Sequence, residues 1–267
     1  MANGISDNME RLILGLPATA SCGATIYPVK VRNYELWGVC KRAITMRQST
    51  LPMPFVVQPY LTALFGFDAA NGFALGLAQS LRILMSLVTL QPVESIDILV
   101  PAENQADIRA IAYNDGEKDI RITPKDFNEV RRIIAEQNGE ELPDESENPE
   151  LVQAQADIAA LNQQDLDFSF ETMLDSIAFA SKVPHKDLLD MTIRSFLRLE
   201  KTITRREMFR IFTSASMSGF VKFPKGNPYP SWMFDKRKDD GGGFENMRDF
   251  AARTGISIDQ HNASIKE

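Results

Sequence analysis

Histidine and cysteine are scarce in this 267-residue sequence, and their positions do not suit metal or redox chemistry. Neither His185 nor His261 has a second histidine or a cysteine at the spacing of a metal site. Cys22 and Cys40 form no CxxC pair, so we expect two reduced, partly buried thiols, although a disulfide between them stays open. We therefore predict no metal site, no cofactor and no catalytic histidine.

The sequence also lacks the glycine-rich and nucleophile motifs of common enzymes. It contains no GxxxxGK[ST], GxGxxG or GxSxG segment. The carboxylate pairs Asp165 with Asp167 and Asp187 with Asp190 have no catalytic motif around them, and surface charge at a helix start explains the second pair. We predict that the protein has no catalytic residues and is not an enzyme.

Long apolar runs free of proline and polar residues are missing as well. Residues 48–67 contain three prolines and residues 69–90 contain Asn71, Gln79 and Arg82, so neither offers the ~20 apolar residues of a membrane span. Residues 12–22 loosely resemble a lipoprotein leader but have no positively charged start, and we interpret them as an early strand or a packed N-terminal arm. We expect no membrane contact.

The composition is that of an ordinary folded protein, with 44% hydrophobic and 24% charged residues. A chain of this length can bury a core without disulfides or metal ions. Its net charge of −7 argues against a general nucleic-acid coat or a basic membrane-surface protein.

Residues 1–92 are predicted to form an apolar N-terminal helical region. We expect residues 1–33 to be irregular and residues 34–44 to form a helix. Two further helices are expected, one starting at Phe55 and a longer one running from Phe73 to Leu90. Apolar residues lie on most faces of the longer helix, which indicates burial in a core or an interface.

Residues 93–139 predict a small three-stranded antiparallel β-insert followed by a helix. Apolar and polar residues alternate in residues 96–100, 108–113 and 119–122, and Asn114-Asp115-Gly116 is a typical hairpin turn. Thr123 as N-cap and Pro124 at the first position should start the helix, and Asn138-Gly139 should end it.

Residues 140–150 are predicted to be an acidic linker. Residues 136–150 contain seven acidic residues, two prolines and no lysine or arginine. Such a charge block is typical of a solvated connection. The alternative interpretation is an acidic mimic that docks on a basic partner.

Residues 151–217 are predicted to form a helical bundle. Apolar stripes recur in residues 152–161, 170–178, 188–199 and 208–212, with Ser169 as a candidate cap and Thr204 as the start of a fourth helix. The short links favour antiparallel neighbours.

Residues 218–267 form a basic-aromatic C-terminal tail. Prolines keep residues 218–238 extended, and lysines alternate there with aromatic residues. This pattern favours docking on a protein, while stacking on single-stranded nucleic acid and plain packing are the alternatives. The candidate partner-binding residues are Phe220, Phe223, Tyr229, Trp232, Phe234, Lys236 and Arg237.

These segments together predict a mainly α, α+β fold. It consists of a helical bundle with a small antiparallel β-insert and an extended C-terminal tail.

Three segments, in this order, resemble proteins encoded in the tail-morphogenesis modules of tailed bacteriophages and related prophages. The resemblance covers about residues 90–200. The segments are Phe127–Ile134 continuing to Gln137-Asn138-Gly139, the acidic break Pro143-Asp144-Glu145 to Asn148-Pro149-Glu150-Leu151, and Asp187–Phe196. Proteins of this kind are regarded as tail or baseplate assembly factors, some of them chaperones of the tape-measure protein.

The resemblance implies a non-enzymatic tail-morphogenesis protein that works in the host cytoplasm as an assembly chaperone. Its partners would be other tail proteins, the tape-measure protein or baseplate proteins among them. One alternative is a structural subunit of the virion tail or baseplate, whose C-terminal tail ties neighbouring copies into a homo-oligomer. A second is a nucleic-acid-binding regulator that acts through residues 218–238. The resemblance rests on helix patterns, so no functional residue carries over from it.

Overall fold

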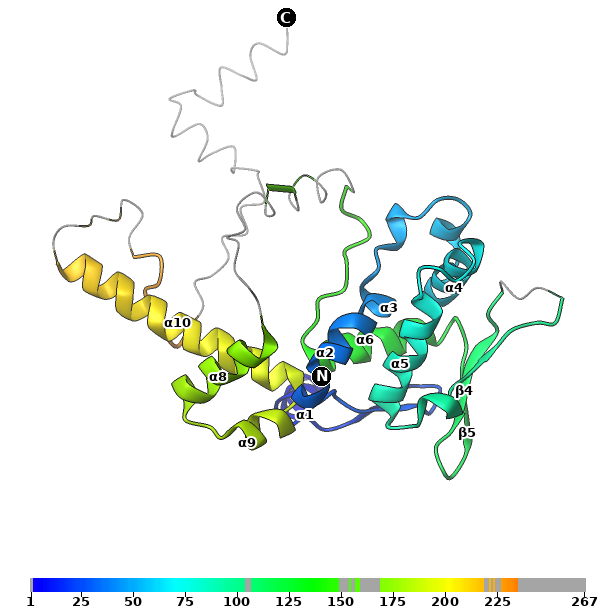
Figure 1. The fold of residues 1–267 in the computed structure, drawn as a ribbon, viewed down its shortest axis with the longest axis horizontal. Helices are drawn as coiled ribbons and strands as arrows, with labels where there is room; N and C mark the ends of the chain where they lie inside the picture. The colour runs from blue at the N-terminus through cyan, green and yellow to red at the C-terminus, as the bar shows by residue number, and fades with distance from the viewer. Residues whose placement is uncertain are drawn as a thin grey trace, which may run out of the picture. The chain divides into compact units, whose positions relative to one another are not determined.

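The computed structural model describes residues 2–103, 107–148, 154, 157–158, 169–218, 221, 223 and 227–234, with side chains from Asn8 onward. The protein is mainly helical with two small antiparallel sheets, which confirms the predicted fold class (Figure 1). The chain divides into two compact units, Met1–Ile203 and Thr204–Glu267.

The chain begins with a helix, α1 (Ala2–Leu14), where the sequence had predicted an irregular segment. The expectation was wrong because Met9, Leu12 and Ile13 already follow helical spacing. Gly15 ends α1 with φ +66°, and the amide of Leu16 donates to the carbonyl of Arg11 at 3.0 Å, as in a Schellman cap. A two-stranded ribbon follows, made of β1 (Ala18–Thr19) and β2 (Thr25–Ile26).

Three helical predictions for the N-terminal region need correction at their boundaries. The single helix expected over residues 34–44 is broken at Lys41 into α2 (Tyr34–Cys40) and α3 (Arg42–Thr45), after a short 3₁₀ turn, η1 (Val31–Asn33). The helix expected from Phe55 starts only at Tyr60, after Pro59, because proline restricts the residue before it. Two 3₁₀ turns precede it: η2 (Gln48–Thr50) and η3 (Phe55–Val57).

Helices α4 (Tyr60–Ala70) and α5 (Leu77–Thr89) form the middle of the first unit. The longer helix was predicted to begin at Phe73, but Gly72, Phe73 and Gly76 all have positive φ, which a helix cannot accommodate. Residues 71–76 therefore form a loop. Figure 1 shows α5 lying beside the three-stranded sheet.

The β-insert is confirmed, with the 3₁₀ turn η4 (Val93–Ser95) leading into β3 (Asp97–Leu99), β4 (Ala110–Asn114) and β5 (Asp119–Ile122). The strand order is β3-β4-β5, so β3 is an edge strand. Ile111 pairs with Ile122 and Tyr113 with Ile120, and all four side chains are buried. In the hairpin turn, Asp115 Oδ1 accepts hydrogen bonds from the amides of Glu117 and Lys118.

Helix α6 (Phe127–Asn138) closes the same core. Thr123 was predicted as N-cap with Pro124 at the first position, but the helix begins at Phe127 with Asp126 as N-cap, because residues 124–126 form a turn in which the amide of Phe127 donates to the Thr123 carbonyl at 3.0 Å. The hydroxyl of Thr123 donates to Asp126 Oδ2 at 2.6 Å, and Gly139 ends the helix with φ +72°. Fully buried side chains of the core come from every element around it: Trp37, Ile44, Leu61, Leu64, Leu81, Leu84, Met85, Ile111 and Phe127.

The helices after residue 168 build a second, smaller cluster. They are α8 (Phe170–Ser181), α9 (His185–Asp190) and α10 (Ile193–Met217). The separate helix expected from Thr204 was wrong: α10 is continuous because residues 193–217 contain neither glycine nor proline. Ser169 is the predicted N-cap, with its carbonyl 3.0 Å from the amide of Met173. The stripe predicted over residues 152–161 lies largely outside the described residues.

The two clusters of the first unit are tied together through a short extended segment. The amide of Val31 donates to the Met191 carbonyl, and the amide of Ile193 donates to the Val29 carbonyl, both at 2.9 Å. The ring of Tyr34 stacks on Phe170 with centroids 4.9 Å apart. These contacts hold α8, α9 and the first turns of α10 against the N-terminal half although they are far apart in sequence.

Candidate protein-binding surfaces

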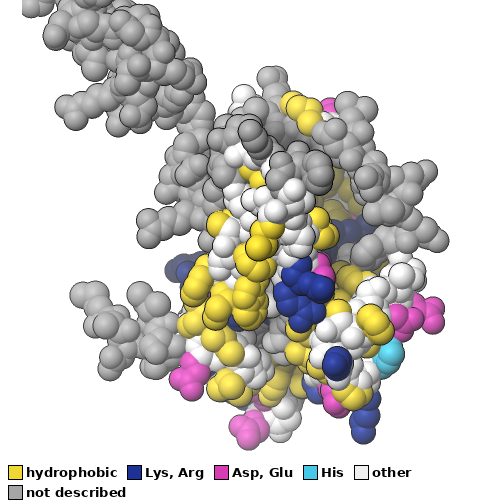
Figure 2. All heavy atoms as spheres, turned by 90° about the vertical axis from the view of Figure 1, so that its left-hand side faces the viewer, with side chains coloured by type: hydrophobic (Ala, Val, Ile, Leu, Met, Phe, Trp, Pro, Cys, Tyr) yellow, Lys and Arg dark blue, Asp and Glu magenta, His cyan; other side chains and the backbone are white. Residues whose placement is uncertain are grey.

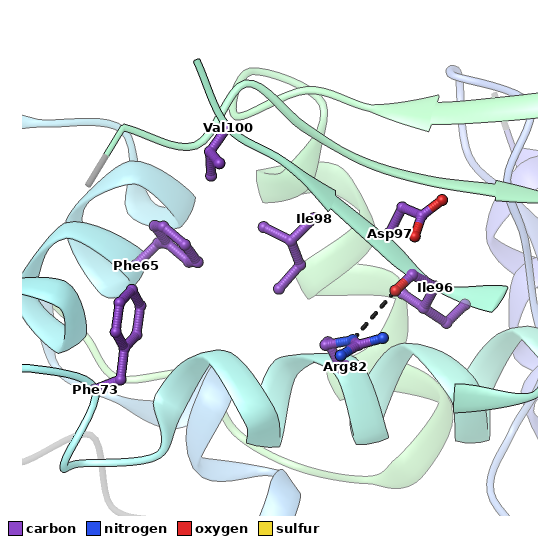
Figure 3. A pocket seen from close by; sticks show the side chains of 7 residues that line it. All are labelled: Phe65, Phe73, Arg82, Ile96, Asp97, Ile98 and Val100. Carbon is purple, nitrogen blue, oxygen red and sulfur yellow. Dashed lines mark hydrogen bonds between the residues drawn. The ribbon is translucent and has the colours of Figure 1, made fainter. Parts of the chain in front are cut away.

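An apolar groove of about 400 Å³ lies between α4, α5 and the edge strand β3. Figure 3 shows Phe65 and Phe73 on one side of it and the side chain of Ile98 on the other. The remaining lining residues are Arg82, Ile96, Asp97 and Val100. Five of the seven lining residues are hydrophobic, and a concave surface of this size that joins apolar and polar groups is typical of a binding site.

The loop of residues 71–76 gives the groove its exposed hydrophobic rim. The Phe73 amide donates to the Asp68 carbonyl at 2.7 Å, and the Phe73 backbone has φ +60°. The carboxylate of Asp68 accepts from the amide of Ala78 at 2.8 Å and so fixes the start of α5. The ring of Phe73 meets Phe65 edge-on at 5.6 Å but stays 47% exposed. Leu75, Leu99 and Val100 are also exposed.

Arg82 gives the groove a positive charge. Its guanidinium donates to the carbonyls of Ile96 at 3.2 Å and Val93 at 3.3 Å, and the first of these bonds is drawn in Figure 3. Within the described residues Arg82 forms no ion pair, although Asp97 lines the same groove. The groove therefore suits a hydrophobic segment that carries an acidic group.

The acidic linker contacts the body of the protein instead of running freely through solvent. Glu140 Oε1 accepts from Lys41 Nζ at 2.7 Å and from the indole nitrogen of Trp37 at 3.3 Å. Glu147 pairs with Arg47 at 3.0 Å. Residues 144–148 are exposed, as a solvated linker predicts, but the ion pairs of Glu140 and Glu147 were not foreseen because the sequence does not reveal which basic residues face them.

Glu145 makes the most specific of these contacts. Its two carboxylate oxygens accept from the backbone amides of Gln48 at 3.1 Å and Ser49 at 2.8 Å. Burial opposes ionisation, but the backbone hydrogen bonds from Ser49 and Gln48 outweigh it and lower the pKa of Glu145. The positive charge of Arg131 contributes in the same direction.

Arg131 of α6 lies buried nearby, with 9% of its surface exposed. Its Nε donates to the Ile44 carbonyl at 2.6 Å, and its guanidinium carbon lies 3.6 Å from the centre of the Tyr60 ring. Its Nη2 is buried without a hydrogen-bond partner. Burial lowers the pKa of Arg131 and raises the pKa of Tyr60 to about 12.

The C-terminal tail is described in part, and it belongs to the second unit. The rings of Phe223 and Tyr229 pack against Phe212 of α10, with centroids 5.5 and 5.2 Å away. Trp232 and Phe234 are exposed. Phe220, Lys236 and Arg237 lie outside the described residues, so the predicted partner-binding role of the tail stays a prediction.

Exposed hydrophobic side chains occur on the terminal helices as well. Phe179 of α8 is 88% exposed and Met217 of α10 is 83% exposed. Figure 2, which views the left-hand side of Figure 1, shows hydrophobic side chains at the surface beside lysines and arginines. Such surfaces favour contact with other polypeptides.

The groups considered for chemistry in the sequence are dispersed. Cys22 is half-buried and Cys40 is buried, and burial raises the pKa of the Cys40 thiol to about 12. His185 is exposed, with Nε2 2.8 Å from Asp175 Oδ1. Asp190 pairs with Arg32 on the surface, and Asp165 and Asp167 lie outside the described residues. In the part of the chain that the structure describes, no three His, Cys, Asp or Glu side chains gather to hold a metal ion.

No helix among the described residues is long and apolar enough to span a membrane.

Comparisons of the chain with protein-family models, curated proteins and solved structures found no match.

Sequence reasoning missed both the groove and the basic surface beneath the acidic linker. The groove had a signal: Gly72 and Gly76 bracket Phe73 and Leu75, a spacing that indicates a loop carrying exposed apolar residues. The basic surface had none, because Lys41 and Arg47 lie about a hundred positions from the glutamates that they bind.

Proposed function

We propose that the protein is a non-enzymatic phage tail-morphogenesis factor that binds a hydrophobic segment of another tail protein. The observation that carries this proposal is the open groove beside β3, which the exposed Phe73 lines, with the exposed Leu75 in the same loop. The resemblance of residues 90–200 to tail-morphogenesis proteins supports it independently.

The occupant is a polypeptide segment with apolar side chains and one acidic group. Phe65, Phe73, Ile98 and Val100 supply apolar contacts, and Arg82 supplies the positive charge that an acidic side chain would meet. A tape-measure protein is a long helical chain with apolar stripes, which need cover before assembly. An acidic, soluble protein with an accessible groove can provide that cover.

The test measures binding of fluorescent peptides from the tape-measure protein encoded in the same genome. The groove variant is Phe73→Asn with Leu75→Ser, because asparagine tolerates the positive φ at position 73. Losing the burial of two large apolar side chains should weaken binding by at least about tenfold. The matched control is Met53→Ser with Val57→Ser, which removes two exposed hydrophobic residues that do not line the groove.

Binding by wild type and by the control, but not by the groove variant, supports the proposal. Absence of binding by wild type, or equal binding by all three proteins, contradicts it. Mass spectrometry of purified particles then separates the assembly factor, which should be absent, from a structural subunit, which should be retained.

A further inference from the structure

The segment of residues 140–148, named here the acidic strap, lies across a surface built from basic and amide donors. This basic strip consists of Lys41, Arg47, the indole nitrogen of Trp37 and the backbone amides of Gln48 and Ser49. Three glutamates of the strap accept hydrogen bonds from these donors. For each donor, the shortest distance to a glutamate oxygen is between 2.7 and 3.3 Å. The spacing of the three glutamates along the strap thus matches the spacing of the donors.

One buried donor beside the strip receives no acceptor from the strap. Arg131 is nine-tenths buried behind it, and the Nη2 of Arg131 has no hydrogen-bond partner. A buried guanidinium nitrogen without an acceptor is costly, so this surface retains capacity for a further anionic oxygen. A ligand that brings more acceptors than the strap would satisfy the strip better.

The strap is bound to the strip mostly by ion pairs and hydrogen bonds, with little hydrophobic packing. Asp144, Glu145, Ser146 and Glu147 are exposed, while Leu142 is the hydrophobic side chain of the strap that packs against the core. Ion pairs at such partly exposed positions contribute only about 0–1 kcal/mol each. A competing acidic segment could therefore take the place of the strap.

We propose that the basic strip is a docking site for an acidic segment of a partner polypeptide, and that the strap occupies it until the partner displaces it. The chemistry of the occupant is read from the strap: a peptide with glutamates at the first, sixth and eighth positions and a turn that joins Asp144 to Glu147. This proposal concerns a different surface from the groove and does not depend on it.

The experiment uses the full chain and a fluorescent synthetic peptide with the sequence of residues 139–148. In the strap variant, Glu140→Gln, Glu145→Gln and Glu147→Gln leave the strip without its internal ligand. This variant should bind the peptide at least about tenfold more tightly than wild type, because wild type has an intramolecular competitor. Raising the salt concentration should weaken binding.

Two controls separate specific docking from general charge effects. The matched variant Glu94→Gln, Glu117→Gln and Glu141→Gln makes the same change in net charge at glutamates outside the strap contacts and should bind the peptide like wild type. Adding Lys41→Gln and Arg47→Gln to the strap variant should abolish binding. A scrambled peptide of the same composition should bind at least about tenfold more weakly than the ordered one, by the loss of matched contacts.

Hydrogen–deuterium exchange on wild type provides a test that needs no variant. An excess of peptide should increase exchange in residues 140–148 and leave the β4–β5 hairpin unchanged. No binding by a folded strap variant, equal binding by wild type and strap variant, equal binding of the scrambled peptide, or unchanged exchange in the strap would each overturn the proposal.

Discussion

Replacing Arg131 with methionine tests the buried contacts that anchor α6 beside the basic strip. Methionine keeps an unbranched side chain but removes the guanidinium. The change deletes the hydrogen bond from Nε to the Ile44 carbonyl at 2.6 Å and the contact over the Tyr60 ring at 3.6 Å. It also removes the unpartnered Nη2 from the interior.

The magnitude follows from opposing contributions. A hydrogen bond from a charged group contributes about 1.5–3 kcal/mol, and a desolvated cation–π contact contributes about 0.5–2 kcal/mol. Removing the unpartnered nitrogen stabilises the folded state by about 1–3 kcal/mol, because its desolvation no longer has to be offset. The difference predicts that Arg131→Met lowers the free energy of unfolding by about 1–2 kcal/mol.

The assay is urea denaturation of the full chain, followed by circular dichroism. The matched control is Arg132→Met, since Arg132 is the exposed neighbour and its Nε lies 3.9 Å from Glu136. The control should change the free energy of unfolding by less than about 0.5 kcal/mol. A double-mutant cycle with Tyr60→Leu should give a coupling of about 0.5–2 kcal/mol. If Arg131→Met is as stable as Arg132→Met, the reasoning about Arg131 is refuted.

Three further predictions concern single sites. Gly15→Ala should lower the free energy of unfolding by about 1–3 kcal/mol, because Gly15 has φ +66° and a Cβ would lie 2.7 Å from Thr192 Cγ2. Adding Thr192→Ser, which removes that methyl group, should recover part of the loss in urea denaturation, and no recovery would contradict the clash. Glu145→Gln should destabilise the protein above about pH 4.5, the ordinary pKa of the group, and the deficit should shrink as pH falls through its lowered folded-state pKa. A deficit independent of pH would count against the contact of the Glu145 carboxylate with the amides of Gln48 and Ser49. Phe212→Ala should speed hydrogen exchange in residues 227–234, because Phe223 and Tyr229 lose the ring on which they pack; unchanged exchange would argue against that packing.

The elements that the sequence predicted well are those with strong local signals. The alternation of apolar residues and the Asn114-Asp115-Gly116 turn predicted β3–β5, and Gly139 marked the end of α6, while its start was placed only to within a turn. In each case the residues that determine the element are neighbours in sequence. Local pattern and tertiary packing agree there.

The elements that were missed depend on backbone conformations or long-range contacts. Phe73 looks like part of a helical stripe, but its positive φ places it in a loop and thereby opens the groove. The acidic strap looks like a solvated linker until Lys41 and Arg47 are brought against it by the fold. Thr204 looks like a helix start although α10 runs through it without a break.

Site-specific photo-crosslinking tests most directly whether the groove beside β3 binds a polypeptide. A photoreactive phenylalanine analogue at position 75, in the same loop as the groove-lining Phe73, is compared with one at position 57, which is more exposed but lies outside the groove. Both proteins are expressed with the tail genes of the same genome, and crosslinked peptides are identified by mass spectrometry. The proposed function predicts crosslinks from position 75, but not from position 57, to one hydrophobic segment of the tape-measure protein or another tail protein. Crosslinks that are absent at position 75, or that are equally frequent at both positions, would contradict it.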